Sequence, residues 1–350
     1  MTFSIQPLDM EAMEAARRRW NSVAKPLNSL GRFEDMTVQM AGITGTAEVA
    51  VLPACVLTFC ADNGVVREGV SQSGQEVTAK VAKSLAEGTA NVSLMAKAAG
   101  ADAFCVDMGM AEAVEHPAII RLGMGRGTAN IAQGPAMSRE TAERAVMAGA
   151  ELAGEMKRRG YRVMAVGEMG IGNTTTASAV ASALLGAAPE EVTGRGAGLS
   201  DEGLRNKVRA IRRALDVNRP DPKDALDVLA KVGGFDLAGM AGAFIGGAAH
   251  RLPVIADGVI SCVAALAAQR LCPGVREFIL PSHQSREPAG RLVLKALGMA
   301  PVIHGDMALG EGTGAVMLLP LLDMALRVYH GVHTFDALRM EAYVPQGGRP

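Results

Sequence analysis

Short apolar runs alternate with helical stretches along this 350-residue chain. The clearest runs are Val51–Ala61, Phe104–Met110 and Val163–Val166, and segments with a helical spacing of apolar residues separate them. This alternation is typical of βαβ units, in which helices join parallel strands. The sequence therefore predicts an α/β fold with a mostly parallel sheet flanked by helices.

Polar or acidic side chains follow the predicted strands at six positions. The carboxyl ends of parallel strands lie along one edge of a sheet, and open α/β sheets bind ligands at that edge. A single residue of this kind is more often an ordinary loop residue, but six in succession favour one shared cleft. The six are Asp62, Asp107, Glu168, Asp257, His283 and Asp306.

The loop after the third of these strands holds the most distinctive pattern. Glu168 follows the strand, and Gly170 and Gly172 allow a tight turn before an alanine-rich helix. At the start of that helix, Asn173 and Thr174 offer side-chain caps beside unpaired backbone N–H groups. Such a turn can serve as a helix cap alone, but the adjacent carboxylate favours a site that holds a phosphate.

A second acidic residue, Glu311, lies in the glycine-rich segment Gly310–Gly314. Glycines on both sides leave its carboxylate open to a ligand, which suits a general base. A Glu has an ordinary pKa of about 4.3, and partial burial raises such a pKa towards the working pH. The alternative role is a helix N-terminal Glu that complements the macrodipole, which is worth only about 0.3–1 kcal/mol.

Another glycine-rich segment, Gly194–Ser200, leads into a helix that carries Lys207. From the first two turns of this helix, the lysine could bring a cation to an anion held near Ser200 or Thr174. Most lysines on amphipathic helices are simply solvated. The prediction therefore depends on the neighbouring glycine-rich segment and not on the residue type alone.

The composition excludes several classes of function. The 35 Lys and Arg residues balance 36 Asp and Glu residues, so no global field attracts nucleic acid or an anionic membrane. Aromatic residues make up only 3 %, which argues against a base-stacking platform for single strands. The cysteines form no CxxC pair, and the chain shows neither a signal-peptide core nor an uninterrupted apolar run of about 18 residues. We therefore predict buried, reduced thiols and a cytoplasmic protein that binds neither nucleic acid nor membrane.

Several longer motifs resemble those of the nicotinate-nucleotide:dimethylbenzimidazole phosphoribosyltransferases. The similarity runs from Pro26 to the C-terminal helix, so it covers nearly the whole chain. The motifs are GEMGIGNTT at 167–175, GRGAGLSDEGLRNK at 194–207, FDLAGMAG at 235–242, ADG at 256–258, SHQSREPAG at 282–290 and LGEGTGA at 309–315.

The resemblance implies transfer of phosphoribose from nicotinate mononucleotide to an aromatic base, giving nicotinate and an α-ribazole phosphate for the lower ligand of cobamides. It also implies a Rossmann-like large domain at 46–320 and a small helical domain formed by 1–45 and 321–350, in a homodimer. No cofactor is implied, and the six histidines show no metal-ligand spacing, so no metal site is expected.

The resemblance further implies roles for individual residues. Glu311 is the expected catalytic base, and Glu168 is a second catalytic carboxylate. A base suits the chemistry, because the attacking benzimidazole must lose its N–H proton, whereas nicotinate leaves a cationic glycosidic bond without an acid. The expected nucleotide-binding residues are Gly170, Gly172, Asn173, Thr174, Lys207, Asp257 and Ser285, and the expected base-binding residues are Ser71, Gln72, Lys80 and Leu309.

The sequence departs from the family pattern near the expected base pocket. It has Val-Thr-Ala-Lys at 77–80 where many relatives have Val-Thr-Ala-Gln, and Asp-Asn-Gly at 62–64 where Asp-His-Gly is common. The preferred base is therefore open among benzimidazole, a substituted relative and adenine. Two other functions stay open: another nucleotide- or sugar-phosphate-handling transferase on this scaffold, and a non-catalytic nucleotide-binding sensor. The Gly- and Ala-rich stretch Leu237–Ala249 predicts very close packing, either within the fold or across a dimer interface.

Overall fold

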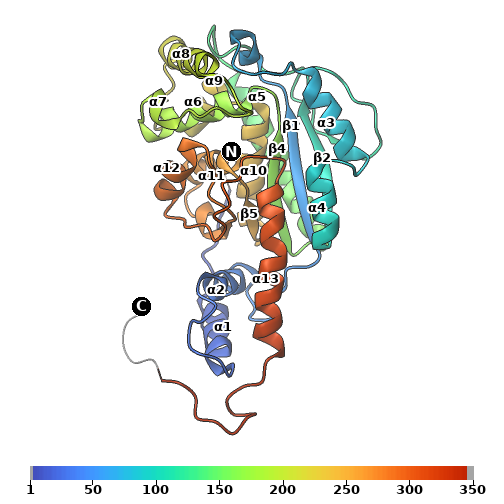
Figure 1. Ribbon diagram of the computed structural model, residues 1–350, viewed down its shortest axis with the longest axis vertical. Helices are drawn as coiled ribbons and strands as arrows, with labels where there is room; N and C mark the ends of the chain where they lie inside the picture. The colour runs from blue at the N-terminus through green and yellow to red at the C-terminus, as the bar shows by residue number, and fades with distance from the viewer. Residues whose placement is uncertain (1–2, 345–350) are drawn as a thin grey trace.

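Within the described residues, a sheet of six strands lies at the centre of the fold. Figure 1 shows this sheet among the helices. The computed structural model describes residues 3–344. The strands are β1 (Ala54–Ala61), β2 (Ala101–Gly109), β3 (Ile119–Arg121), β4 (Val163–Met169), β5 (Val254–Ala256) and β6 (Ile279–Pro281). Their order in the sheet is β3-β2-β1-β4-β5-β6, and every neighbouring pair is parallel. This is the Rossmann strand order, so the predicted α/β fold with a parallel sheet is confirmed.

The strand order reverses between β1 and β4, and sheets of this kind bind ligands outside the carboxyl ends of the strands at that point. Every residue of β1 is buried, as expected for a central parallel strand covered on both faces. In the pairing of the two strands, Phe59 lies opposite Glu168 and Cys60 lies opposite Met169. The acidic end of β4 is therefore level with the end of β1.

Helices cover both faces of the sheet (Figure 1). They are α1 (Met10–Ser22), α2 (Arg32–Thr44), α3 (Glu76–Ala86), α4 (Asn91–Ala99), α5 (Arg139–Arg158), α6 (Asn173–Leu185), α7 (Pro189–Val192), α8 (Asp201–Asn218), α9 (Ala225–Val232), α10 (Phe235–Ala249), α11 (Val259–Leu271), α12 (Pro288–Leu297) and α13 (Thr313–Gly331), with short 3₁₀ helices at Gly64–Glu68 and Val275–Phe278. One apolar cluster joins a face of the sheet to α5, α6, α9, α10 and α11. A second cluster joins the other face to α1, α2, α3, α4 and α13.

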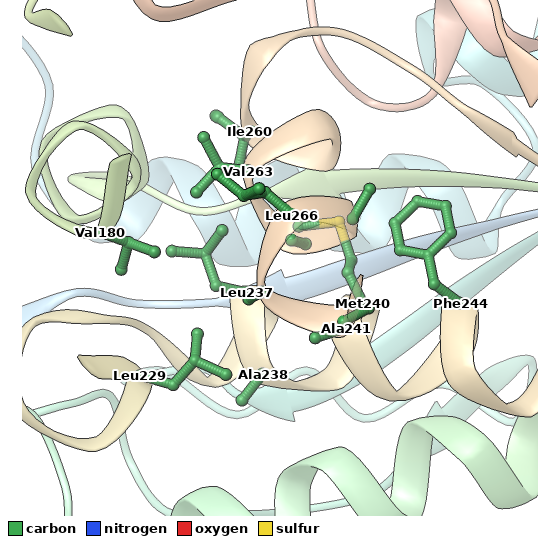
Figure 2. Close-up of a cluster of buried hydrophobic side chains, with 14 of the residues drawn as sticks. Val180, Leu229, Leu237, Ala238, Met240, Ala241, Phe244, Ile260, Val263 and Leu266 are labelled. Atoms are coloured by element: carbon green, nitrogen blue, oxygen red, sulfur yellow. The ribbon is translucent and has the colours of Figure 1, made fainter. Parts of the chain in front are cut away.

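The Gly- and Ala-rich stretch forms α10 and packs within the fold. A Cβ atom on Gly242 would lie 1.9 Å from Val146 O of α5, so glycine lets the two helix backbones touch. On its other side, α10 contributes Leu237 and Met240 to the buried cluster in Figure 2, together with side chains of α6, α9 and α11. The close packing predicted for this stretch is thus found inside the chain.

Helices α1 and α2 pack against the C-terminal half of α13, below the sheet in Figure 1. Trp20 of α1 meets Tyr329 of α13 edge to face, with ring centroids 4.9 Å apart. The small helical domain at 1–45 and 321–350 stays a prediction, and α13 runs unbroken through its expected boundary after residue 320. Residues 1–2 and 345–350 of that prediction lie outside the described residues.

Two predicted elements end elsewhere than expected. The strand β4 continues to Met169, because Gly167 leaves room for another backbone segment: a Cβ atom there would lie 2.1 Å from Gly312 N. The helix predicted over 75–98 is divided into α3 and α4. Gly88 adopts a left-handed φ of 74° between them, which ends the first helix.

Candidate active site

A cavity of about 290 Å³ opens at the carboxyl ends of β4, β5 and β6. This is the edge at which such a sheet binds ligands. Its walls come from segments that are far apart in the sequence. The predicted site residues that line it are Glu168, Gly170, Asn173, Thr174, Asp257, Ser285 and Leu309.

The turn between β4 and α6 forms one wall of the cavity. A Cβ atom on Gly170 would lie 2.1 Å from Ala61 O, so only glycine fits where the turn crosses the end of β1. Gly172 is the N-cap of α6 with a φ of 96°, and no side chain caps this helix. The expected capping by Asn173 and Thr174 is therefore wrong, and these side chains have other partners. The start of α6, with the positive end of its dipole, lines the cavity.

Lys207 of α8 reaches the same turn although it is fully buried. Its Nζ donates to Thr174 Oγ1 at 2.8 Å and to Gly194 O at 3.1 Å. Neither partner is charged, and Lys207 forms no ion pair within residues 3–344. Burial lowers the pKa of Lys207 from 10.5 to about 8, which the negative charge of Glu287 opposes. An ammonium has three N–H donors, so one remains for an anion.

Glu168 lines the cavity and is otherwise buried. Its Oε2 accepts a hydrogen bond from Asn173 Nδ2. Burial raises the pKa of Glu168 well above its ordinary range, the nearby Asp236 and Asp257 raise it further, and Asn173 opposes the shift. Glu168 therefore holds a proton more readily than a solvent-exposed Glu does.

Asp236 lies behind Glu168 and is completely buried. Burial raises the pKa of Asp236 to about 6. Its Oδ1 accepts from Leu237 N at 2.9 Å, whereas its Oδ2 has no hydrogen-bond partner within residues 3–344. The amides of Asn173 and Asn63 nevertheless lie close enough to lower the pKa of Asp236. Burial and mutual repulsion therefore disfavour simultaneous ionisation of the carboxyl groups in this region.

The backbone of Glu311 is held in a strained conformation next to Glu168. Glu311 has a left-handed φ of 62°, between Gly310 at 87° and Gly312 at 97°. This region is unfavourable for a residue with a side chain, and such strain gathers at functional sites. The Glu311 N–H donates to Glu168 O at 3.1 Å, and the Glu311 carbonyl accepts from Thr58 Oγ1 at 2.8 Å.

The carboxylate of Glu311 lies outside the cavity lining and contacts the start of α4. Its Oε1 accepts from Asn91 Nδ2 at 2.8 Å, and its Oε2 accepts from Val92 N at 3.1 Å. The residue is 6 % exposed, so the expectation of an open carboxylate is wrong. Glu168 and Glu311 are thus joined by a backbone hydrogen bond, but their carboxyl groups have different surroundings, an arrangement that suits separate acid and base roles.

Asp257 holds the segment that carries Glu311. Its Oδ2 accepts from Gly312 N at 3.2 Å and its Oδ1 from Ala315 N at 3.1 Å, at the start of α13. His283 Nδ1 lies 3.8 Å from Asp257 Oδ1. Burial raises the pKa of Asp257 and lowers the pKa of His283. Asp257, expected to bind the nucleotide, therefore already uses both oxygens to anchor the neighbouring helix.

The residues expected to bind the aromatic base do not all reach the cavity. Leu309 lines it, whereas Ser71, Gln72 and Lys80 do not. The Gln72 side chain donates to Ala197 O at 3.2 Å, and Lys80 is exposed on α3. These three residues therefore form no part of the cavity wall.

Three of the six strand-end residues line the cavity: Glu168, Asp257 and His283. Asp62 instead accepts from Thr78 Oγ1 at 2.7 Å and Ala111 N at 2.8 Å. Asp107 does not line the cavity, and Asp306 is exposed outside it. The strand-end rule thus locates the edge correctly but does not say which side chains face inwards.

Sequence reasoning missed several residues of the site. Ser73 lines the cavity but belongs to no distinctive local pattern. Val77 also lines it and begins the Val-Thr-Ala-Lys segment noted near the expected base pocket. Glu287 also lines it, and its Oε1 accepts from Gly196 N at 3.1 Å. Asp236 and Glu287 lie inside the motifs FDLAGMAG and SREPAG, which was the available signal. No such signal marks Asn91.

Among residues 3–344, no group of His, Cys, Asp and Glu side chains has the arrangement of a metal site. The five cysteines are free thiols and are buried, as predicted. No helix of the described chain is both long enough and apolar enough to cross a membrane.

The sheet has the Rossmann order, and its carboxyl edge holds a glycine-rich turn suited to anions, a buried lysine and two glutamates whose backbones are hydrogen-bonded to each other. These features define an α/β protein with a cleft at the carboxyl edge of its parallel sheet. Residues 5–339 match the model of a family described as phosphoribosyltransferase. The chain therefore belongs to that phosphoribosyltransferase family.

Known relatives are similar over nearly their whole length. The nicotinate-nucleotide–dimethylbenzimidazole phosphoribosyltransferase of Acetivibrio thermocellus is 46 % identical over 343 residues, which cover 98 % of each chain. The enzyme of the same name from Escherichia coli is 42 % identical over 330 residues, covering 94 % of this chain and 92 % of the relative. The crystal structure of CobT from Thermus thermophilus matches with a TM-score of 0.90 at 41 % identity, covering 95 % of this chain and 99 % of that one.

Proposed function

We propose that this chain transfers phosphoribose from nicotinate mononucleotide to dimethylbenzimidazole or a related base. The products are nicotinate and an α-ribazole phosphate, which serves the assembly of the lower ligand of cobamides. The names of relatives at 46 % and 42 % identity support this activity. The observation that carries it is the meeting of the Lys207–Thr174 contact, Glu168 and Glu311 at one edge of the sheet.

In the proposed complex, the nucleotide phosphate lies at the start of α6. Backbone N–H groups of the turn at Gly170 and Gly172, the side chains of Asn173 and Thr174 and the Lys207 ammonium surround that position. Ser285, which also lines the cavity, adds a hydroxyl group. The state of Lys207 supports this assignment, because a buried ammonium without a charged partner gains most from an incoming anion.

The reaction breaks the bond between ribose C1′ and the nicotinate nitrogen, and the electron pair returns to the cationic ring. One ring nitrogen of benzimidazole forms the new bond to C1′, and the other loses a proton. Glu311 takes that proton in the proposed mechanism. Each of its oxygens accepts one N–H bond from the start of α4, which leaves a lone pair on each for the substrate.

Glu168 acts from the cavity side in this mechanism. Its raised pKa favours the protonated form in the free protein. Entry of the cationic nicotinate ring favours the carboxylate, which then stabilises positive charge on the ribose as the bond breaks. The Asn173 amide holds the Glu168 carboxyl group for this role.

The aromatic base lies against Leu309 in the proposed complex, and Val77 and Met169 are further apolar residues of the cavity lining. The base-binding roles of Ser71, Gln72 and Lys80 stay predictions. The choice among benzimidazole, a substituted relative and adenine stays open as well.

A panel of bases tests this function. The protein is incubated with nicotinate mononucleotide and each base, and chromatography measures nicotinate and the new nucleotide. We expect nicotinate release that depends on the added base and one α-ribazole phosphate per nicotinate. A transferase with another substrate would give no base-dependent release. A sensor would bind the nucleotide without turnover, although the presence of Glu168 and Glu311 argues against a sensor.

We also propose a cytoplasmic homodimer without nucleic-acid or membrane partners. The family resemblance supports the dimer, and the balanced charge supports the absence of polyanionic partners. Light scattering at several concentrations tests the dimer, and a monomer at every concentration would contradict it.

A further inference from the structure

Helix α4 begins without a cap from its own sequence. Its N-cap residue is Ala90, which makes no side-chain hydrogen bond, although Ser, Thr, Asp and Asn are preferred at this position. Glu311 supplies the missing acceptor, because its Oε2 binds Val92 N at 3.1 Å. The helix start and the expected catalytic base, 219 residues apart in the chain, are therefore joined directly.

Asn91 adds a second contact that the helix itself does not require. Its Nδ2 donates to Glu311 Oε1 at 2.8 Å. Asn91 is otherwise exposed, so water would satisfy its amide if this contact were absent. The contact therefore acts on the carboxylate: one N–H donor on each oxygen sets both the position and the rotation of the group.

The backbone of Glu311 is fixed, so the orientation of its carboxylate is the main conformational freedom of the residue. Its N–H and carbonyl are bonded to Glu168 O and Thr58 Oγ1, and its backbone is held in the left-handed region. A side chain on such a fixed backbone can still rotate about its own bonds. The pair of donors from α4 removes that rotation, which is how a general base is held ready for a substrate.

We propose that Asn91 is the positioning residue of Glu311, and that its amide holds the carboxylate in the orientation that accepts the proton of the incoming base. This inference rests on the proposed function, in which Glu311 is the base. The Asn91 amide donates directly to Glu311 Oε1 at 2.8 Å, so in this proposal Asn91 acts through Glu311.

The first test compares kinetics of Asn91 variants with nicotinate mononucleotide and dimethylbenzimidazole. In Asn91→Ala, we expect kcat to fall about tenfold while the KM for the nucleotide stays within about twofold, because the phosphate contacts lie elsewhere. Asn91→Asp keeps the shape but loses the donor and adds a negative charge, so its kcat should fall further. Asn91→Gln keeps an amide donor and should recover part of the loss. Leu94→Ala changes an exposed residue of the same helix and serves as the matched control.

A double-mutant cycle separates positioning from a purely structural role. In a Glu311→Gln background, Asn91→Ala should cause no further loss of kcat, because the group that it positions is already disabled. Independent, multiplying losses would overturn the proposal, and so would wild-type kcat in Asn91→Ala. If Asn91→Ala lowers the unfolding temperature, Asn91→Gln decides, and a kcat no higher than that of Asn91→Ala counts against positioning. An equal loss of kcat in Asn91→Ala and in Leu94→Ala also counts against positioning. Full activity in Glu311→Gln alone would instead refute the general-base assignment, so the two failures are distinguishable.

Discussion

Replacing Lys207 by Met tests the phosphate site at its charged centre. Met has a similar length but lacks the ammonium that binds Thr174 Oγ1 at 2.8 Å. A hydrogen bond to a charged group contributes about 1.5–3 kcal/mol, and about 1.4 kcal/mol is tenfold. We therefore expect the Kd for nicotinate mononucleotide to rise about 10–150-fold, with a smaller change in kcat.

The same substitution should leave the fold intact, because the buried ammonium lowers the stability of the ligand-free protein. Its folded-state pKa of about 8 lies below the ordinary 10.5. Between these pH values the unfolded chain binds more protons than the folded chain, so the stability of the wild type should rise with pH. At 1.36 kcal/mol per pH unit, the full rise is about 3 kcal/mol, and Lys207→Met should lack it.

Calorimetric titration with nicotinate mononucleotide measures the Kd, and urea unfolding between pH 8 and pH 10.5 measures the stability. Lys83→Met is the control, because Lys83 is an exposed lysine on α3. An unchanged Kd in Lys207→Met would refute the phosphate assignment. A wild-type stability that stays level or falls over this pH range would refute the argument from the buried ammonium.

Three further predictions concern the support of the site. In Gly170→Ala the new Cβ would lie 2.1 Å from Ala61 O, so we expect a loss of about 1–3 kcal/mol or more in urea unfolding; a wild-type midpoint would contradict the tight crossing. In Asp257→Asn one of two N–H groups at the start of α13 loses its acceptor, so stability should fall by about 1–3 kcal/mol and kcat should fall with it; unchanged unfolding would show that another group holds this segment. Burial raises the pKa of Asp236 from 3.8 to about 6, so its contribution to stability is full below pH 3.8 and is lost as the pH rises to about 6. Asp236→Asn should flatten the stability profile over that range, and a profile that keeps its wild-type slope would contradict this.

The sheet could be predicted from the sequence because its signal is local. Buried parallel strands are continuous apolar runs, and Val51–Ala61 and Phe104–Met110 contain most of β1 and β2. The end of β4 could not be predicted, since it depends on a segment near Gly312 that packs against Gly167. The local sequence pattern also could not show that Gly88 would divide the helix predicted over 75–98 into α3 and α4.

The site residues also divide into those with a local sequence signal and those placed by distant parts of the chain. Glu168, Gly170 and Thr174 belong to one short motif, and all three line the cavity. Lys207 could be suspected from its helix, but its complete burial depends on how α8 packs over α6. The role of Asn91 could not be predicted at all, because its partner lies 220 residues away and its own neighbourhood contains no motif.

In the proposed mechanism, Glu311 takes the proton of the attacking base. The most direct measurement is nicotinate release from nicotinate mononucleotide by the wild type and by Glu311→Gln, with dimethylbenzimidazole present or omitted. We predict that the wild type releases nicotinate only with the base, and that Glu311→Gln is at least about tenfold slower with an unchanged Kd for the nucleotide. Equal release without the base would contradict transfer to the base, and full base-dependent activity in Glu311→Gln would contradict the role of Glu311 as the general base.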